Sequence, residues 1–473
     1  MIKRENLEPL SKEDIIDLFV EFAEKVENQI LEMKDDIRSL QDENRQLKMP
    51  KNSQNSSQPP SHDFGRLPRQ KSLRKPSGKN SGGQLGHPGS TLNQVSNPDQ
   101  IIVHKPSHLC LKCGKVHTSD AFVLQSKRQI VDIPPIQPVV TEHQVYQLKC
   151  RCGYEDIAQF PAGVTAPVKY GNQLTAFVSY LSTRQYIPFG RLPELLKCIC
   201  NLTLSQGTIY NMLNRVSDNL LPLYHGIKQN VQNAKVVGSD ESGIKVNNAN
   251  YWTWTWQTET ETFIKIVPGR GYCNIENEFS EGFPQAILVS DSLAAQLKTP
   301  ALLHQLCLAH LLRELNAFIE AFKNPWAIKM KGLFEKAIEL KHTLLPEQYA
   351  YPNKERDEII KEFHVLLDQP IETEVLKLPA FHRRLIKRKD NIFPFLFYHD
   401  VPFDNNGSER AIRNIKVKQK VSGGFRSTRG AEIFAVSRSV IDTWIKRGTN
   451  IFDSLKFAIR LAEEKQHFLS ISS

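Results

Sequence analysis

The most regular pattern of apolar positions runs along residues 16–47, where they recur at intervals of three and four in strict alternation. This heptad repeat, with a period of about 3.5 residues, is typical of a coiled coil rather than of a helix packed on its own protein. Asn44 falls at an a position, where a buried amide fixes the register of a parallel dimer. We therefore predict a dimerising coiled-coil helix over residues 11–48, with an amphipathic helix packed on its own chain as the alternative. The heptad positions are Ile16, Phe19, Ala23, Val26, Ile30, Met33, Ile37, Leu40, Asn44 and Leu47.

Apolar runs of a different kind predict a sheet between residues 229 and 318. Residues 235–240 and 286–291 are apolar without alternation, as in central strands covered on both faces, and each run ends in an aspartate. Residues 251–257 alternate strictly and place three tryptophans on one face, which favours a buried sheet face over stacking on nucleobases. We assign residues 229–318 to the first part of an α/β core and 396–425 to its second part. Further strands are expected at 244–246 and 262–267, and a helix at 304–318.

Helical periodicity dominates the other regions. Within residues 165–228, a helix at 192–199, a break at 200–204 and a helix that begins at Ser205 are typical of a helix-turn-helix. Ser205 and Thr208 would then face DNA, although an ordinary helical hairpin has the same pattern. Residues 319–395 are interpreted as a helical insertion with a basic run at 383–389, and residues 426–473 as C-terminal helices.

Composition limits the class of protein and its surroundings. The 473 residues suffice for several domains, and a formal charge of +10 favours an anionic partner, either nucleic acid or a membrane surface. No signal peptide and no run of about 18 apolar residues is visible, so we expect a cytoplasmic protein that does not span a membrane. Residues 49–100 are polar, and 51–80 hold seven Lys and Arg against one Asp, which predicts a basic flexible linker. Such a linker is either simply solvated or an arm that follows phosphates.

Two cysteine pairs predict a zinc-ribbon-like domain over residues 101–160. Eight cysteines without a secretory signal indicate a reducing compartment. The two pairs lie at expected turns next to extended runs at 129–133 and 139–148, and four thiolates on two turns form a closed, structural zinc site. The second pair has one intervening residue instead of two, so a histidine could replace one thiolate. The candidate ligands are Cys110, Cys113, Cys150 and Cys152, with His104, His108 or His117 as substitutes.

Three acids and a row of cations form the candidate catalytic site. Asp240 and Asp291 end two apolar runs, and if these strands lie side by side both carboxylates reach the same ion. Glu409 follows a turn at 404–408 whose short polar side chains suit a helix N-terminus. From 410 to 430 there are seven Lys and Arg and no acid, which suits a metal-binding acid beside a polyanionic backbone, with a solvated basic helix as the alternative. The cations expected to contact DNA are Arg413, Lys416, Lys420 and Arg426.

Four further residues are expected to support this site. Cys307 and His310 lie three apart on one face of the helix expected at 304–318. Such a pair could bind a metal, but without two further ligands we favour structural packing. Asn405 and Asn406 precede Glu409 in the turn and complete the set.

With these motifs the chain resembles the insertion-sequence-66 family of bacterial transposases over nearly its full length. The likeness includes the zipper, the linker segments NSQNSSQPPS and SGGQLGHPG, the paired-cysteine ribbon, SDESG at 239–243 and LVSD at 288–291. HQLCLAH at 304–310 and DNNGSER at 404–410 are its specific motifs. The resemblance implies a multidomain α/β protein with a ribonuclease-H-like core and a DDE triad, carried onto Asp240, Asp291 and Glu409. The shortened second cysteine pair departs from the family pattern.

The resemblance also implies an activity and its partners. A DNA transposase would cut at the ends of an insertion sequence and join the freed 3′-OH to target DNA by two-metal phosphoryl transfer. Its oxygen-only triad favours two Mg²⁺ or Mn²⁺ ions, beside structural Zn²⁺ in the ribbon. Expected partners are terminal inverted repeats, target DNA, a second copy through the coiled coil, and small accessory proteins of the element. The alternatives are a DNA nuclease of the same fold and a catalytically silent, transposase-derived DNA-binding regulator.

Overall fold

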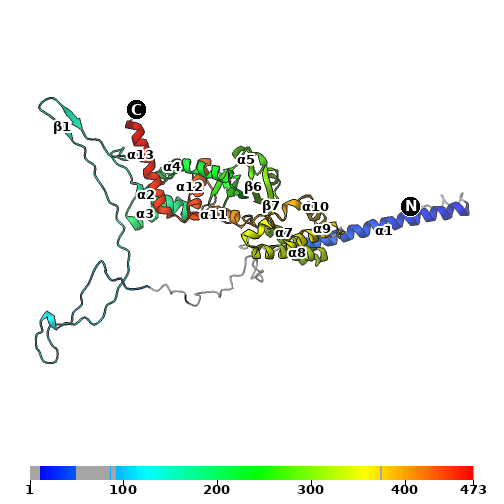
Figure 1. The fold of residues 1–473 in the computed structure, drawn as a ribbon, viewed down its shortest axis with the longest axis horizontal. Coiled ribbons are helices and arrows are strands. Elements are labelled where there is room, and N and C mark those ends of the chain that lie inside the picture. Colours follow the sequence, from blue (N-terminus) through cyan, green and yellow to red (C-terminus); the bar gives the residue numbers. More distant parts are fainter. Residues whose placement is uncertain (1–10, 49–85, 87–91, 373–374, 376, 472–473) are drawn as a thin grey trace.

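The structure, a computed structural model, describes residues 11–48, 86, 92–372, 375 and 377–471 of the chain. A sheet with helices on both faces forms its centre, while a long N-terminal helix and an extended arm project away from it (Figure 1). The predicted linker lies outside the described residues, apart from Gly86 and 92–100. No helix of the described part has the length and apolar character needed to cross a membrane.

The central sheet is mixed, with the strand order β5-β4-β3-β6-β7. An antiparallel meander of β3 (Val236–Val246), β4 (Ala249–Gln257) and β5 (Thr262–Val267) forms one half. β6 (Phe283–Ser290) and β7 (Ala301–Leu306) form the other half, with β6 parallel to β3 and β7 parallel to β6. Because parallel neighbours need a crossover, the chain leaves the sheet before each of them. The crossovers contain α5 (Tyr272–Glu278) and α6 (Ala294–Lys298).

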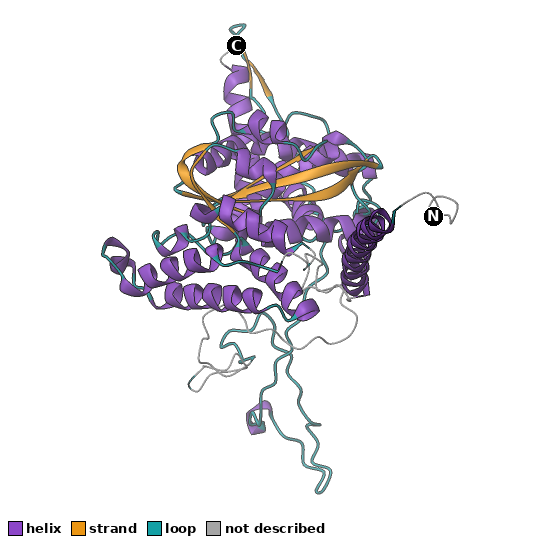
Figure 2. Cartoon of the chain, turned by 90° about the vertical axis from the view of Figure 1, so that its right-hand side faces the viewer, coloured by secondary structure: helices purple, strands orange, loops and turns teal. Residues whose placement is uncertain are grey.

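Helices lie on both faces of the sheet (Figure 2). Alternate residues of the strands build two different cores, one on each face. Val237, Leu288 and Trp254 face one core, which contains α2 (Asn172–Ser179), α4 (Gln206–Gln232), α12 (Thr428–Lys446) and α13 (Ile451–Ile471). Ile287 and Val289 face the other core. That core contains α7 (Leu308–Phe322), α8 (Pro325–Thr343), α9 (Lys354–Asp368) and α10 (Leu378–Lys387). Neighbouring residues of one strand therefore contact different helices, so only side chains on the same face of the sheet can form one site.

Short helices complete the chain between these elements. α3 (Leu192–Cys200) precedes α4, and α11 (Asn406–Ser422) packs on β3 and β4. Ser205 begins α4, as predicted, because its Oγ accepts a hydrogen bond from Thr208 N at 3.0 Å. The remaining short elements are a π-helical turn (Tyr180–Arg184) and 3-10 turns at Ser119–Ala121, Pro346–Ala350, Lys389–Asn391 and Pro394–Leu396.

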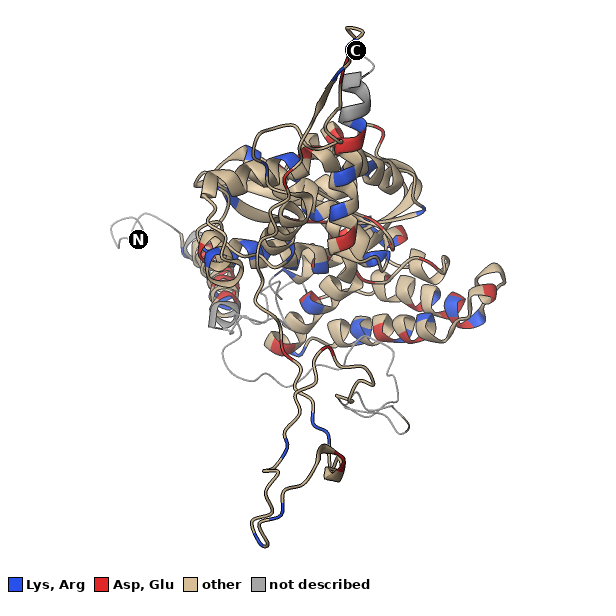
Figure 3. Ribbon diagram, turned by 90° about the vertical axis from the view of Figure 1, so that its left-hand side faces the viewer, with Lys and Arg blue, Asp and Glu red and all other residues tan. Residues whose placement is uncertain are grey.

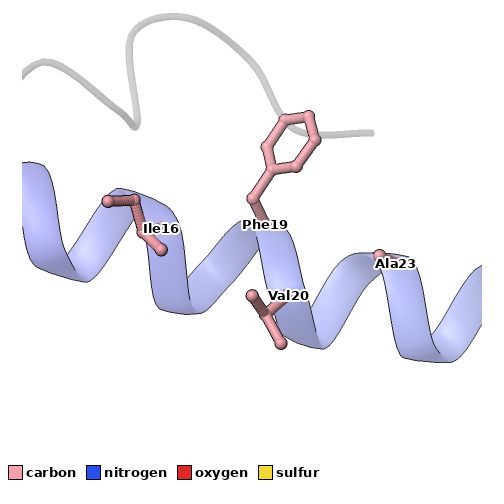
Figure 4. Close-up of a pocket in the computed structure, with 4 residues that line it drawn as sticks. All are labelled: Ile16, Phe19, Val20 and Ala23. Atoms are coloured by element: carbon pink, nitrogen blue, oxygen red, sulfur yellow. The ribbon is translucent and has the colours of Figure 1, made fainter.

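The N-terminal helix α1 (Lys12–Lys48) is continuous, as the heptad repeat predicts. Its large apolar side chains are open to solvent in the single chain, with Phe19 69% exposed and Leu40 64% exposed. Four of them, Ile16, Phe19, Val20 and Ala23, line a shallow hollow on the helix (Figure 4). Acidic and basic residues are interspersed along the rest of the helix (Figure 3). Within the described part of the chain, no other element covers Phe19 or Leu40.

The structure corrects three predicted elements. The run at 235–240 and the strand at 244–246 form one strand, because β3 pairs with β4 without interruption from Gly238 to Val246. Residues 304–306, predicted to be helical, belong to β7. Three residues with one apolar side chain define no period, and pairing with β6 selects the strand. The run at 129–133 forms no strand, and that at 139–148 does so only where β1 (Gln147–Lys149) pairs with β2 (Glu155–Ile157).

Candidate functional site

Asp240 and Asp291 lie on neighbouring parallel strands. Gly238 pairs with Val289 in the register of β3 and β6, so two residues further along each strand Asp240 comes level with Asp291. By the alternation along each strand, both side chains project from the face of the sheet that α7 and α11 cover. Asp291 directly follows β6, whereas Asp240 lies inside β3, which continues beyond the end of β6. The sheet thus brings two of the three predicted acids together.

The electrostatics of Asp240 reflect this crowding. Burial, followed by the carboxylates of Asp291 and Glu241, raises the pKa of Asp240 well above its ordinary value. A hydrogen bond from Glu241 N to Asp240 Oδ1 at 2.8 Å and the nearby His310 offset the rise only in part. Burial and like charges both disfavour ionisation of Asp240, and a bound cation would stabilise the ionised carboxylate against both.

Glu241 occupies the opposite face of β3. Its side chain is 6% exposed and contacts Arg270 Nη2 at 2.6 Å, while Gln296 Nε2 donates to its other oxygen at 3.2 Å. Burial raises the pKa of Glu241, although Arg270 opposes the rise. This acid is therefore held within the protein, away from the face that carries Asp240.

Helix α7 presents His310 and Arg313, one turn apart, to the acids. His310 Nδ1 lies 3.0 Å from Asp291 Oδ1, and Arg313 Nη1 lies 2.9 Å from His310 Nε2. Burial lowers the pKa of His310, but contacts with Asp291 and Cys307 outweigh it and raise the pKa to about 11. The guanidinium of Arg313 opposes that rise, because it can only donate and so requires a lone pair on Nε2. With Arg313 donating to Nε2, the ring proton lies on Nδ1, although Nδ1 and Asp291 Oδ1, 3.0 Å apart, do not meet in hydrogen-bond geometry.

Glu409 lies in the first turn of α11, with a side chain that is 16% exposed. Its Oε1 lies 3.6 Å from Arg313 Nη2, and its Oε2 lies 3.2 Å from Arg413 Nη2. Arg413 is 69% exposed, so that ion pair contributes only about 0–1 kcal/mol. Glu409 is thus connected to Asp291 through Arg313 and His310. Sequence reasoning missed Arg313, although its spacing of three residues from His310 places both on one face of a helix.

Asn405 joins all three parts of the site. It is 2% exposed, and its Nδ2 donates to Ser239 O, the residue before Asp240, at 2.7 Å. Its backbone N–H donates to Cys307 Sγ at 3.3 Å, and its carbonyl accepts from Glu409 N at 3.1 Å. Its neighbour Asn406 instead contacts Asp404, whose Oδ1 accepts from Asn406 N at 3.1 Å. Asn405 therefore fixes the start of α11 against β3.

Cys307 and His310 acquire a further candidate ligand in the structure. The ligand atoms of Asp291, Cys307 and His310 lie within 4.8 Å of one another. Thiolate and imidazole favour a softer ion such as Zn²⁺, whereas three carboxylates favour Mg²⁺. Asp291 belongs to both sets, so the two ions would compete for it.

The basic residues of α11 and its continuation do not share one environment. Arg413, Lys420 and Arg426 are exposed. Lys416 Nζ donates to Gly243 O at 2.6 Å, and burial lowers its pKa. Lys418 is buried, and burial lowers its pKa as well. Of the cations expected to contact DNA, Lys416 is thus bound to β3 in this structure.

The four candidate zinc ligands lie in two separate turns. Cys110 and Cys113 form one turn, in which Gly114 N donates to Cys110 O at 2.8 Å, and backbone N–H groups lower the pKa of Cys110. Cys150 and Cys152 form the other, at the β1–β2 hairpin, where a contact with Cys150 lowers the pKa of Cys152. Both turns suit thiolate ligands. No group of three candidate ligands in the described residues includes any of these cysteines.

Comparison with known families gives three matches. Residues 167–433 match the transposase IS66 family, and residues 108–153 match the zinc-finger binding domain of transposase IS66. Residues 13–93 match a family of unknown function. No curated protein matches the sequence closely enough to count as a relative.

These matches cover the parts of the chain that carry the chemistry. The zinc-finger match spans all four candidate thiolates and supports zinc binding there. The transposase match contains α2 to α11, and with them the three acids. Since it extends over 267 of the 473 residues, more than half, the chain belongs to the IS66 family of transposases.

Proposed function

We propose that this chain is a DDE transposase, which cuts DNA at the ends of its insertion sequence and joins the freed 3′-OH to target DNA. The observation that carries the proposal is the arrangement of Asp240 and Asp291 on one face of two parallel strands, with Glu409 linked to them by α7. The strand order supports a ribonuclease-H-like core, in which an antiparallel meander precedes two parallel strands.

Asp240, Asp291 and Glu409 would hold two Mg²⁺ or Mn²⁺ ions. The donor set fits, because it offers only carboxylate oxygens, and because the burial and the neighbouring carboxylates that raise the pKa of Asp240 both disfavour an ionised carboxylate that has no cation beside it. When bound, such ions activate the attacking oxygen and stabilise the leaving oxygen of an in-line phosphoryl transfer.

The residues around the acids would position them. His310 Nδ1 lies 3.0 Å from Asp291 Oδ1 and would help to orient that carboxylate, and Asn405 holds the first turn of α11 on β3. Arg413 is exposed enough to leave Glu409 for a phosphate once a cation satisfies that carboxylate. Lys420 and Arg426 would contact the DNA backbone without reading sequence.

Other regions would bring the DNA and a second copy to this core. α3 and the start of α4 form a helix-turn-helix-like pair, in which Thr208 lies at the start of the second helix. The cysteine turns would close around zinc, and α1 would form a parallel dimer through its exposed apolar seam.

The test is an assay that reads cleavage and joining separately. Purified full-length protein is incubated with Mg²⁺, a duplex carrying the ends of its own element, and a labelled target. We expect a new 3′-OH at the element end, followed by its joining to the target. Cleavage without joining would indicate a nuclease, and end binding without cleavage a regulator; either result contradicts the proposal.

A further inference from the structure

Helix α10 and the turn after it carry a dense group of cations in the helical insertion. From Lys377 to Lys389 the sequence has six Lys and Arg and no acid. The orientation of the helix is fixed, because Leu378, Phe381 and Leu385 are buried in the core shared with α7 to α9. Arg383 and Lys387 consequently lie exposed on its outer side. We refer to Arg383, Lys387, Arg388 and Lys389 as the α10 cations.

Ion pairs distinguish the α10 cations from three lysines of α8 and α9. On α8 and α9, Lys331, Lys336 and Lys354 lie 3.8–3.9 Å from glutamates. Among the described residues, the α10 cations form no such pair, while Arg384 of the same helix contacts Glu314 Oε1 at 2.7 Å. A solvated face of a long helix usually mixes its charges, as α9 does, so this positive surface needs another explanation.

The position of α10 relies on the same elements that position the acids. Glu314, the partner of Arg384, directly follows Arg313, which contacts Glu409 and His310. The chain after α10 is bound to β7, since Gln305 Nε2 donates to Ile392 O at 3.0 Å and Gln305 Oε1 accepts from Phe395 N at 2.9 Å. Figure 1 shows α10 beside α7 and β7.

Arg388 lies near the end of β7 that leads to the site. After burial, its charge is the next cause that lowers the pKa of His304. His304 pairs with Leu288, and Leu306 with Ser290, the residue before Asp291. Arg388 and the turn Lys389–Asn391 thus lie beside β7, the edge strand next to the strand that leads to Asp291.

We propose that the α10 cations bind the phosphate backbone of the duplex that extends beyond the catalytic acids, outside the contacts made by α11. This inference rests on the proposed function for the identity of the ligand. Arg383, Lys387 and Lys389 are exposed and Arg388 is half-buried. Exposed Lys and Arg side chains that lack acidic partners release counterions when phosphates replace solvent, which gives sequence-independent affinity. The surface would therefore hold any duplex and would not select the terminal repeats.

The experiment measures the salt dependence of DNA binding by full-length protein. The variant combines Arg383→Ala, Lys387→Ala and Lys389→Ala, which leaves the contact between Arg384 and Glu314 intact. Its control combines Lys331→Ala, Lys336→Ala and Lys354→Ala, which removes the same number of charges from lysines that are paired with glutamates on α8 and α9. Both are prepared with Asp240→Asn so that binding is measured without cleavage. The ligands are a duplex with the element end and an unrelated duplex of the same length.

The slope of log K against log salt is negative, and we expect the α10 variant to make it less steep by up to about 2.7 on both duplexes. Each phosphate that the protein no longer neutralises accounts for about 0.9. The control should change the slope by much less. Equal slopes for wild type, variant and control, in proteins with unchanged thermal melting, would overturn the inference. The single change Lys387→Ala, which should make the slope less steep by about 0.9, serves if the triple variant melts early.

Failure of this inference is distinguishable from failure of the proposed function. If the wild-type protein cuts and joins DNA but the slopes do not change, only the role of α10 is wrong. If the slopes change while the wild-type protein neither cuts nor joins, α10 binds DNA in a protein that is not a strand-transfer enzyme.

Discussion

Gly238 offers a test of how closely α11 must approach β3. A Cβ at this position would lie 2.7 Å from Ser408 Oγ, 2.7 Å from Gln257 Nε2 and 3.0 Å from Asn405 Oδ1. Ser408 and Asn405 belong to the first turn of α11, directly before Glu409. In Gly238→Ala, the added methyl group meets these side-chain ends, and because Ser408 and Asn405 are buried we expect the displacement to reach this turn.

The size of the effect follows from these distances. Ordinary carbon contacts need about 3.5 Å, so α11 would move by roughly 0.8 Å. Overpacking of this kind costs about 1–3 kcal/mol, equivalent to a fall of about 2–12 °C in Tm for a domain of about 150–250 residues. Misplacement of a catalytic group by about 1 Å costs on the order of 100-fold in rate. We expect Gly238→Ala to remain folded but to cleave element ends about 100 times more slowly.

The matched control is Gly243→Ala on the same strand, where no atom lies within 4 Å of the new Cβ. It should melt and cleave like the wild type, since its carbonyl still accepts from Lys416. Ser408→Ala should restore part of the activity of Gly238→Ala, because it removes one of the contacted atoms and Ser408 Oγ has no hydrogen-bond partner. Wild-type cleavage by Gly238→Ala, or an equal loss in Gly243→Ala, would refute the reasoning.

Four further predictions concern the acids, the metals and the N-terminal helix. Cleavage and joining should be abolished by each of Asp240→Asn, Asp291→Asn and Glu409→Gln, and the triple variant should be little worse than any single one. Glu241→Gln, which changes the opposite face of β3, should keep more activity in the same assay. Because the pKa of Asp240 is raised, the folded state keeps a proton that the unfolded state has lost, and the stability of the fold falls as pH rises through that pKa. Mg²⁺ binds the ionised carboxylate, so it should raise Tm more at higher pH. A Tm shift with Mg²⁺ that is independent of pH, or unchanged in Asp240→Asn, would contradict this. Purified protein should carry about one zinc per chain by elemental analysis, and Cys110→Ser should lower that content, while protein prepared without chelator that lacks zinc would exclude the ribbon. Full-length protein should sediment as a dimer and Phe19→Glu as a monomer, and a wild-type monomer at micromolar concentration would remove the coiled coil.

The sequence by itself determined the elements whose cause is local. A heptad repeat specifies α1, Ser205 specifies the start of α4 through its own hydroxyl, and the strand at 262–267 has the bounds predicted for it. Apolar runs that end in Asp240 and Asp291 were sufficient to predict adjacent central strands. These features depend on neighbours within one or two turns of the chain, so their signals lie within a short window.

Tertiary structure decided what depends on partners far away in the chain. Residues 304–306 become a strand only because β6 lies beside them, and β3 is continuous only because β4 pairs along its whole length. The contacts of Arg313 with Glu409, of Asn405 with Ser239 and of Lys416 with Gly243 likewise join residues from different elements. The amino acid at each of these positions is found both on protein surfaces and in buried contacts, so its type alone does not predict its partner. Packing selects between them, because only in the assembled sheet and helices do a charge and its partner reach the same place.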